Sequence, residues 1–192
     1  MPLNKSVNVP ALPRKLDLQD INKALSDRDD IIRSLFENSP YIELQKLASQ
    51  PLPTGTTVPT RVVWDRLIIS RPYDYRTRSN ILYMSTDPAG QLTRLYCTIN
   101  CQLLLTYVVS FNGSTAGTLR KTVVTKNGVD VNGSVLRISQ ATDPLVIPVM
   151  TIVEITAGDY VDITAVQDSG VMMSILGSNN NNTSSLKARV LF

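Results

Sequence analysis

From residue 61 to residue 192, apolar and polar residues alternate with a period of two, and turn sequences interrupt the alternation at short intervals. This alternation places successive side chains on opposite faces and is typical of half-buried β-strands. Since no long helical pattern separates the strands, we expect antiparallel sheets. The turn sequences combine Asn, Asp, Ser, Pro and Gly, which favour tight turns. They are Asp87-Pro88-Ala89-Gly90, Asn112-Gly113, Asn127-Gly128, Asn132-Gly133, Ala157-Gly158-Asp159 and Ser169-Gly170.

The predicted strands recur at intervals of roughly 8–12 residues, a spacing that favours a β-sandwich or barrel. They cover residues 61–70, 79–85, 92–99, 101–111, 118–125, 131–139, 145–155, 160–167, 171–176 and 186–192. Apolar residues alternate to the end of the sequence at Phe192, so the last strand is expected inside a sheet. We therefore predict a mainly β fold, an antiparallel jelly-roll sandwich, over residues 61–192.

Residues 1–60 lack this alternation. Residues 1–15 contain three prolines and no periodicity, which indicates an extended arm. Residues 50–60 are rich in proline and predict a linker. The sequence between them, residues 17–49, has apolar residues at helical spacing. These are Leu18, Ile21, Leu25, Ile32 and Leu35, continued by Ile42, Leu44 and Leu47.

Two interpretations of the helical segment stay open: short helices that pack on the β domain, and a short coiled coil that trimerises. In both, residues 1–60 form an N-terminal arm with short helices, and we expect this arm to be an attachment module. Its candidate attachment residues are Leu18, Ile21, Leu25, Ile32 and Leu35.

The chain contains no histidine. This absence excludes Ser-His-Asp and Cys-His nucleophilic catalysis and His-ligated metal sites. Asp159 and Asp162 are three residues apart, which on a strand places them on opposite faces, so they do not form a catalytic carboxylate pair. Asp159 is instead expected to bind its own turn, and calcium held by loops is unsupported. We predict no catalytic residue, no cofactor and no metal, and hence no enzyme.

Cys97 and Cys101 are the two cysteines. If both lie on one strand, their Cα atoms are about 13 Å apart, too far for a disulfide. We expect free thiols and synthesis in a reducing compartment; a bridge in a hairpin or between subunits is the alternative. No apolar stretch is long enough to span a membrane, and the first residues show no apolar secretion signal.

The net charge of +3 is concentrated in residues 51–95, which hold six arginines and three aspartates. Arginine and aromatic residues alternate there. They are Arg61, Trp64, Arg66, Arg71, Tyr73, Tyr75, Arg76 and Arg78. Because these residue types are enriched at protein interfaces, we interpret the set as a candidate interface. A solvated sheet edge and a surface for single-stranded nucleic acid are the alternatives; we do not expect nucleic acid as the partner.

The last hundred residues carry a recognisable order of motifs. A long apolar strand from Leu103 to Phe111 comes first, and a strand into the turn of Asn127 and Gly128 follows. Next comes Val153–Ile163 with a Gly-Asp-x-Val step at Gly158 and Asp159, then a Ser-Gly step and a closing strand. This order resembles the C1q/tumour-necrosis-factor-like jelly-roll family.

The resemblance implies a jelly roll that assembles as a homotrimer, with turns at Asn127, Gly128, Gly158 and Asp159. The chain has no collagen-like stalk. It is therefore more similar to the form of this fold found in virus and phage surface proteins, which include decoration, spike, fibre-head and penton proteins.

We expect a non-enzymatic structural protein of a virus or phage particle, assembled in the host cytoplasm and located in the virion. It would be a self-associating, trimeric decoration, spike or minor capsid protein, anchored to other capsid proteins through residues 1–60. One alternative is a receptor- or glycan-binding head that uses the loops Asn112–Gly117 and Asn179–Ser185. Another is a penton or capsid-building single jelly roll with five-fold stoichiometry.

Overall fold

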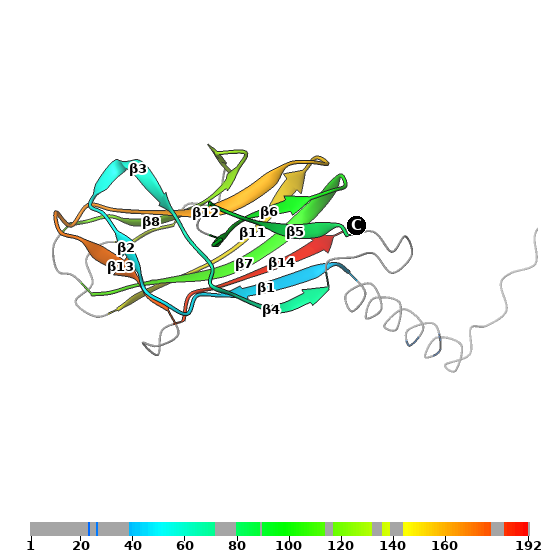
Figure 1. The fold of residues 1–192 in the computed structure, drawn as a ribbon, viewed down its shortest axis with the longest axis horizontal. Coiled ribbons are helices and arrows are strands. Elements are labelled where there is room, and N and C mark those ends of the chain that lie inside the picture. The colour runs from blue at the N-terminus through cyan, green and yellow to red at the C-terminus, as the bar shows by residue number, and fades with distance from the viewer. Residues whose placement is uncertain are drawn as a thin grey trace, which may run out of the picture. The chain divides into compact units, whose positions relative to one another are not determined.

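The structure is a computed structural model that describes residues 39–71, 80–88, 90–113, 117–131, 136–138, 144–177 and 183–191, together with Lys23 and Ser26. The chain divides into two units, Met1–Asn38 and Ser39–Phe192. The five candidate attachment residues lie outside the described residues, and of the helical segment predicted over residues 17–49 the part before Ser39 is described only at Lys23 and Ser26, which are helical. The strands all belong to the second unit, which is drawn as a ribbon in Figure 1.

Two antiparallel sheets make up this unit. The first sheet has the order β2 (Gln50–Leu52), β13 (Met173–Ile175), β7 (Cys101–Phe111), β14 (Ser185–Leu191), β1 (Tyr41–Gln45) and β4 (Arg66–Arg71), with β11 (Leu145–Ile155) also paired to β7. The second sheet has the order β10 (Leu136–Ile138), β8 (Arg120–Lys126), β12 (Tyr160–Gln167), β6 (Leu92–Cys97) and β5 (Leu82–Thr86), with β3 (Gly55–Arg61) paired to β12 and β9 (Val129–Asp130) paired to β8.

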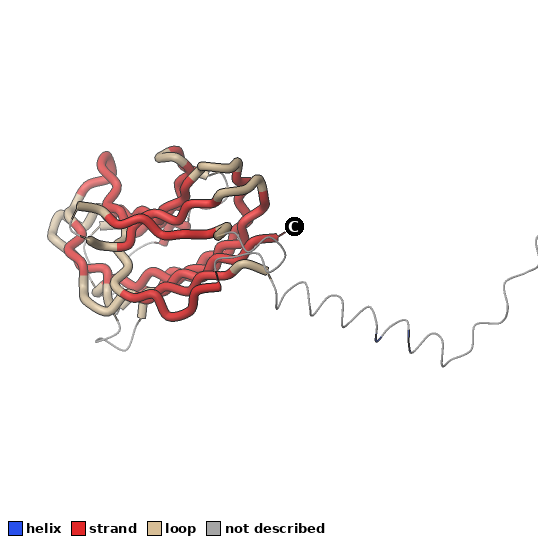
Figure 2. The backbone as a smooth tube through the Cα atoms, turned by 45° about the vertical axis from the view of Figure 1, so that its right-hand side comes forward, coloured by secondary structure: helices blue, strands red, loops and turns tan. Residues whose placement is uncertain are grey.

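The chain passes repeatedly from one sheet to the other. It runs from β6 in the second sheet to β7 in the first, then to β8, β11, β12 and β13, changing sheet at each of these steps. Figure 2 shows the strands in two layers that face each other. Two facing antiparallel sheets with interleaved strands form a jelly-roll sandwich, as the alternation of the sequence predicts.

The core lies between the sheets and is built by inward-facing residues of alternate positions. On β7 these are Leu103, Leu105, Tyr107 and Val109, which are at most 1% exposed. They face Ile163 and its buried apolar neighbours in the same cluster. Burying side chains of this size contributes roughly 1.5–3 kcal/mol each, so this layer is the main source of stability.

The sequence prediction is wrong for residues 39–60. Tyr41–Gln45 forms β1, with Ile42 and Leu44 buried between β14 and β4, rather than the end of a helix. Pairing on both edges outweighs local helical preference at this position. The predicted boundary between residues 60 and 61 falls inside β3, and the compact β unit already begins at Ser39.

Three predicted strands agree with the structure in both bounds: 101–111, 145–155 and 160–167. The single strand predicted over residues 61–70 is divided instead. Between β3 and β4 the chain leaves both sheets, and Trp64 makes only an isolated bridge to Leu92.

Candidate assembly surface

β11 is a long edge strand with apolar side chains on both faces. All eleven of its residues pair with β7, and no further strand pairs with β11 among the described residues. Ile147 and Val153 point into the core. The alternate residues Val146, Met150 and Ile152 point outward and are 40%, 72% and 53% exposed.

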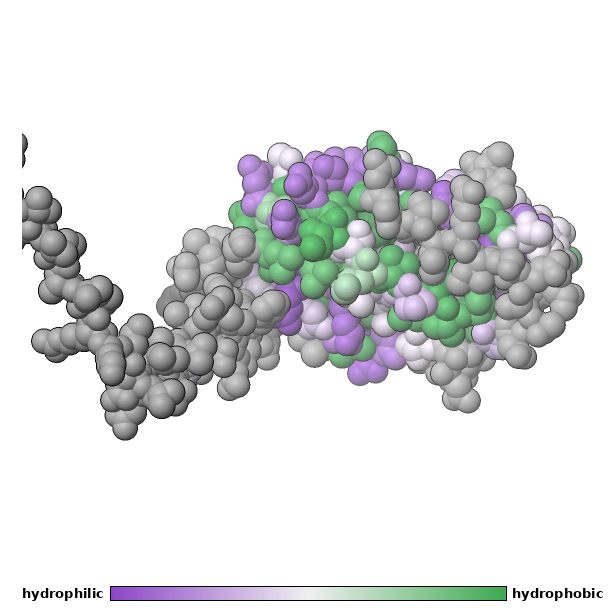
Figure 3. All heavy atoms as spheres, turned by 180° about the vertical axis from the view of Figure 1, so that it is seen from behind, coloured by the Kyte–Doolittle hydropathy of each residue, from purple (hydrophilic) through white to green (hydrophobic). Residues whose placement is uncertain are grey.

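Pro148 lies among these outward positions and is also exposed. Proline has no backbone N–H to donate and is therefore confined largely to edge strands, which agrees with the position of β11. Across the ladder, Pro148 pairs with Val108 and Ile152 pairs with Leu104, both half-buried on β7. We call this group the β11–β7 outer face; its members are Leu104, Val108, Val146, Pro148, Met150 and Ile152. Figure 3, which views the molecule from behind, shows a broad gathering of hydrophobic side chains.

The apolar surface continues from β11 to the β8–β9 hairpin. Ile152, Val129 and Val131 line a groove of about 260 Å³ with their neighbours, and Val129 is 70% exposed. The Lys126 ammonium closes one end by donating to the Glu154 carbonyl at 3.1 Å. Large exposed apolar patches of this kind mark contact sites for protein or ligands.

The other half of the outer face of this sheet, over β14 and β1, is polar. Lys187 on β14 forms an ion pair with Glu43 on β1 at 3.2 Å. The Arg189 guanidinium lies 5.0 Å from the centre of the Tyr41 ring, and the Tyr41 hydroxyl donates to Glu43 at 2.8 Å. Burial, followed by this hydrogen bond, raises the pKa of Tyr41 to about 12.

A hollow of about 200 Å³ lies where the two halves of the sheet meet. Tyr41, Leu104, Thr106, Lys187 and Arg189 line it. We call it the Tyr41 hollow. The Tyr41 ring and Leu104 give the hollow apolar surface, which can receive an apolar side chain that projects from another molecule.

The sequence reasoning did not identify the β11–β7 outer face, although β11 itself was predicted. The signal was present in the sequence Leu145–Ile155, where both alternating sets are apolar and a proline interrupts the run. In an antiparallel sheet a strand that is apolar on both faces has a second surface to cover. The sequence pattern alone does not distinguish a strand that is buried on both faces from a strand at an exposed sheet edge.

The four described residues of the predicted arginine–aromatic interface are distributed between the core and two sheets. Trp64 is a core residue with 1% exposure, so it cannot make an exterior contact. Arg61 belongs to β3 in the second sheet, whereas Arg66 and Arg71 lie at the two ends of β4 in the first sheet. Tyr73, Tyr75, Arg76 and Arg78 lie outside the described residues.

Arg61 instead joins a cluster around the buried Asp162. Its Nε donates to the Asp162 carboxylate at 2.6 Å, the Thr125 hydroxyl donates to the same carboxylate, and Arg94 Nε lies 3.9 Å away. The Arg94 guanidinium also lies 4.4 Å from the centre of the Tyr160 ring. Strand register assembles this cluster from four strands, and sequence proximity alone cannot reveal it.

The predicted turn residues lie together. Asn127 has φ 52° and Gly128 has φ 81°, while Gly158 has φ 92°. The Asn127 side-chain amide donates to the Asp159 carboxylate at 2.7 Å, which also accepts the Thr156 backbone N–H at 2.9 Å. These bonds hold the pKa of Asp159 below its usual value, and the bond from Asn127 has the largest effect. The two turns therefore brace each other.

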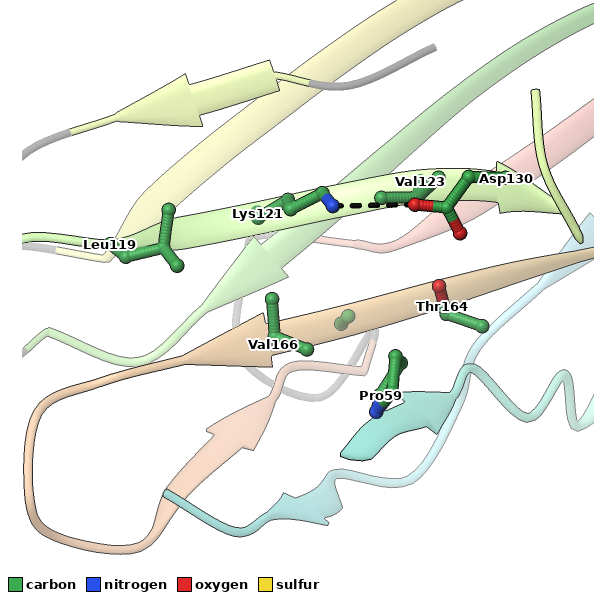
Figure 4. A pocket seen from close by; sticks show the side chains of 8 residues that line it. Pro59, Leu119, Lys121, Val123, Asp130, Thr164 and Val166 are labelled. Atoms are coloured by element: carbon green, nitrogen blue, oxygen red, sulfur yellow. Dashed lines mark hydrogen bonds and ion pairs between the residues drawn. The ribbon is translucent and has the colours of Figure 1, made fainter. Parts of the chain in front are cut away.

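A further pocket of about 150 Å³ lies on the second sheet between β3, β8 and β12 (Figure 4). Lys121 and Asp130 form an ion pair across it at 3.4 Å, and Pro59, Val123 and Val166 supply apolar walls. In the described residues no three metal-ligating side chains of His, Cys, Asp or Glu gather into a cluster. Within the described ranges, no helix is long and apolar enough to cross a membrane.

No protein-family model matches the chain, and no curated protein matches it. Solved structures do match. The crystal structure of murine APRIL superposes with a TM-score of 0.50 at 13% identity, over 80% of this chain and 99% of that chain. The globular domain of zebrafish complement 1qA protein superposes with a TM-score of 0.44 at 9% identity, over 80% of this chain and 98% of that chain. At this identity the match to murine APRIL shows the fold alone, and the chain has the same antiparallel jelly-roll fold, as the sequence predicts.

Proposed function

We propose that this chain is a non-enzymatic structural protein of a virus or phage particle that assembles as a homotrimer through the β11–β7 outer face. The observation that carries the proposal is the row of exposed apolar side chains on an edge strand. Met150 and Ile152 are more than half exposed, and leaving them in water forfeits roughly 25 cal/mol for each Å² of apolar surface. A second copy of the chain is the occupant that we assign to this face.

The two halves of the sheet complement each other. One half offers projecting apolar side chains, Met150 and Ile152, and the other offers the Tyr41 hollow. Contact between unlike patches is heterologous, and it closes into a ring when the rotation between copies returns to the start. Three copies would each place the β11 edge against the hollow of the next copy.

The composition of β11 supports a protein contact. Glu154 is its only charged residue, and the centres of protein interfaces are depleted of charge. Charged residues make up 18% of the whole chain, below the quarter that is typical of globular domains.

The particle context rests on the division of the chain. Met1–Asn38 is a unit separate from the β unit, and its apolar residues Leu18, Ile21, Leu25, Ile32 and Leu35 are assigned to attachment. Three arms on one trimer would bind a capsid shell together, so weak individual contacts would add to a stable one.

Sedimentation equilibrium of the full chain tests the assembly. We expect a mass three times the 21.2 kDa of one chain. Met150→Glu and Ile152→Glu should shift the mass to that of a monomer, because each buries a charge in an apolar contact. The matched control is Val171→Glu, since Val171 is 54% exposed and lies outside the proposed surface; it should remain trimeric. A monomeric parent chain would overturn the proposal, and a five-fold mass would replace it with the penton alternative.

Attachment is tested separately with capsid shells of the virus or phage that encodes the chain. The full chain should sediment with the shells, and the double variant Leu18→Asp/Ile21→Asp should stay in the supernatant while remaining trimeric. Equal sedimentation of both proteins would remove residues 1–38 from the attachment role. No sedimentation of the parent trimer with any shell would overturn the particle context.

A further inference from the structure

Cys97 and Cys101 lie at a crossing between the two sheets. Cys97 is the last residue of β6 in the second sheet, and Cys101 is the first residue of β7 in the first sheet. The three residues between them change the direction of the chain and bring the two Sγ atoms to 3.3 Å. The separation of about 13 Å applies only if both cysteines lie on one strand, and this condition is not met because β6 ends at Cys97.

Backbone bonds to neighbouring segments hold the cysteine pair in place. The Cys97 N–H donates to the Asp159 carbonyl at 3.2 Å, and the Gly158 N–H donates to the Cys97 carbonyl at 2.8 Å. On the loop, the Thr98 N–H donates to the Ile81 carbonyl at 2.9 Å. Proximity of the two sulfurs is thus imposed by at least two other segments of the fold and does not depend on the short loop alone.

The two thiols differ in environment. Cys97 is buried at 2% exposure, and Cys101 is half-buried. A hydrogen bond from Cys101 lowers the pKa of Cys97 to about 7, although burial opposes this change. The same hydrogen bond, together with burial, raises the pKa of Cys101. The pair therefore holds one thiolate near neutral pH beside one thiol that retains its proton, the arrangement found in reactive dithiols.

We propose that Cys97 and Cys101 form a reactive dithiol site that a small oxidant of the peroxide class converts into a disulfide joining the two sheets. The oxidant has to be small because Cys97 is enclosed. It can reach the pair from the side of Cys101, which is half-buried. The dithiol state should also bind trivalent arsenicals, which bridge two neighbouring sulfurs.

The oxidation takes place in two balanced steps. The thiolate attacks one peroxide oxygen, so an S–O bond forms, the O–O bond breaks, and hydroxide leaves with the electron pair. The sulfur of the remaining thiol then attacks the sulfenic acid, forming the S–S bond and breaking the S–O bond. The departing hydroxyl takes the thiol proton and leaves as water. The proton released when the thiolate formed neutralises the hydroxide of the first step, so that overall two thiols lose two electrons and two protons and the peroxide is reduced to two waters.

Intact mass spectrometry of the native full chain tests this site. After treatment with hydrogen peroxide and quenching, we expect a loss of two hydrogen masses per chain, no remaining alkylatable thiol, and full reversal by dithiothreitol. Cys97→Ser and Cys101→Ser are the matched controls. Each should gain oxygen or form a bond between chains, without the internal loss of two hydrogens. An unchanged mass of the parent chain, or bonds only between chains, would overturn the proposal.

Arsenical binding gives a second readout that does not need oxidation. Phenylarsine oxide should bind the reduced parent chain in equal molar amount and protect it from alkylation. Neither serine variant should bind it, while the far-ultraviolet circular dichroism of both variants should match that of the parent. If a serine variant does not fold, the parent chain with both thiols alkylated under native conditions serves as the control. Failure of the reduced parent to bind the arsenical would contradict the assigned proximity of the two sulfurs.

Discussion

Asp162 is a buried carboxylate, and its neighbours offset the free-energy cost of removing its charge from water. Its side chain is 1% exposed, and the partner Arg61 is 38% exposed. Removing one partner of such a pair leaves a charge without compensation, which costs more than the pair contributes. Residues that are far apart in the sequence, such as Arg61 and Asp162, thereby fix how β3 lies on β12.

Replacement of Arg61 should expose this dependence. We expect Arg61→Ala to lower the free energy of unfolding by about 2 kcal/mol, less than for a fully buried pair because solvent reaches the guanidinium. Urea unfolding, followed by the fluorescence of the tryptophan, measures this change in the free energy of unfolding. Arg66→Ala, which removes an exposed arginine on β4, should change the free energy by less than about 0.5 kcal/mol. Equal effects in the two variants would contradict the role assigned to Arg61.

Tyr107 makes the stability of the fold depend on pH in the alkaline range. Burial raises its pKa to about 12, although the hydrogen bond with Thr122 at 3.3 Å opposes this change. The unfolded chain releases the phenol proton near pH 10. The stabilising contribution is therefore complete below pH 10 and is lost as the pH rises towards 12.

Chemical denaturation between pH 9 and pH 12 tests Tyr107. Tyr107→Phe should show a smaller loss of stability across this range than the parent chain, because it has no proton to lose. Tyr83→Phe, which changes a 45% exposed tyrosine, should retain the slope of the parent. Parallel pH profiles of the parent and Tyr107→Phe would show that this residue does not contribute.

Among the elements, the connection after β13 passes close to the backbone of another segment. A Cβ added at Gly177 would overlap the backbone carbonyl of Leu47 and approach Ala48. The three nearest atoms are all backbone atoms of this one segment, so no side chain can move aside to make room. Only glycine allows the segment after β13 to pass so close to the segment after β1.

Alanine substitution separates this close approach from simple backbone strain. Gly177→Ala should destabilise the fold by about 3 kcal/mol, the upper range for overpacking. Gly90→Ala is the matched variant, because φ is 79° there and a Cβ meets nothing within 4 Å. It should cost about 1 kcal/mol through conformational strain alone. Thermal unfolding of the two variants shows which substitution destabilises the fold more. A larger effect at Gly90 would contradict this account.

The elements also show how far sequence patterns reach. Strands such as β7, β11 and β12 were predicted with their bounds because their alternation is long and turn residues flank them. β1 was mistaken for helix because Leu47, three residues after Leu44, adds helical spacing, whereas only Ile42 and Leu44, two residues apart, match the period of a strand. The assembly surface and the Cys97–Cys101 contact depend on which strands are neighbours and where one strand ends. Neither fact is contained in the local pattern.

For the whole molecule, the order of the strands in space differs from their order in synthesis. β14 is the last described strand of the chain, and it lies between β7 and β1 in the first sheet. Its Ser185–Leu191 backbone forms ladders with Tyr107 and its neighbours on one side and with Ile42 and its neighbours on the other. The centre of this sheet is thus completed by the last of its strands in sequence order.

A consequence follows for folding on the ribosome. Until residue 191 has emerged, β1 and β7 each have an open edge where β14 belongs, and the apolar surface of both remains in contact with water. Non-local pairing of this kind is slow and leaves such edges exposed to other nascent chains. Folding of the β unit therefore has to wait for the synthesis of β14, and conditions that slow translation between β13 and β14 will lengthen the period in which neighbouring chains can pair incorrectly.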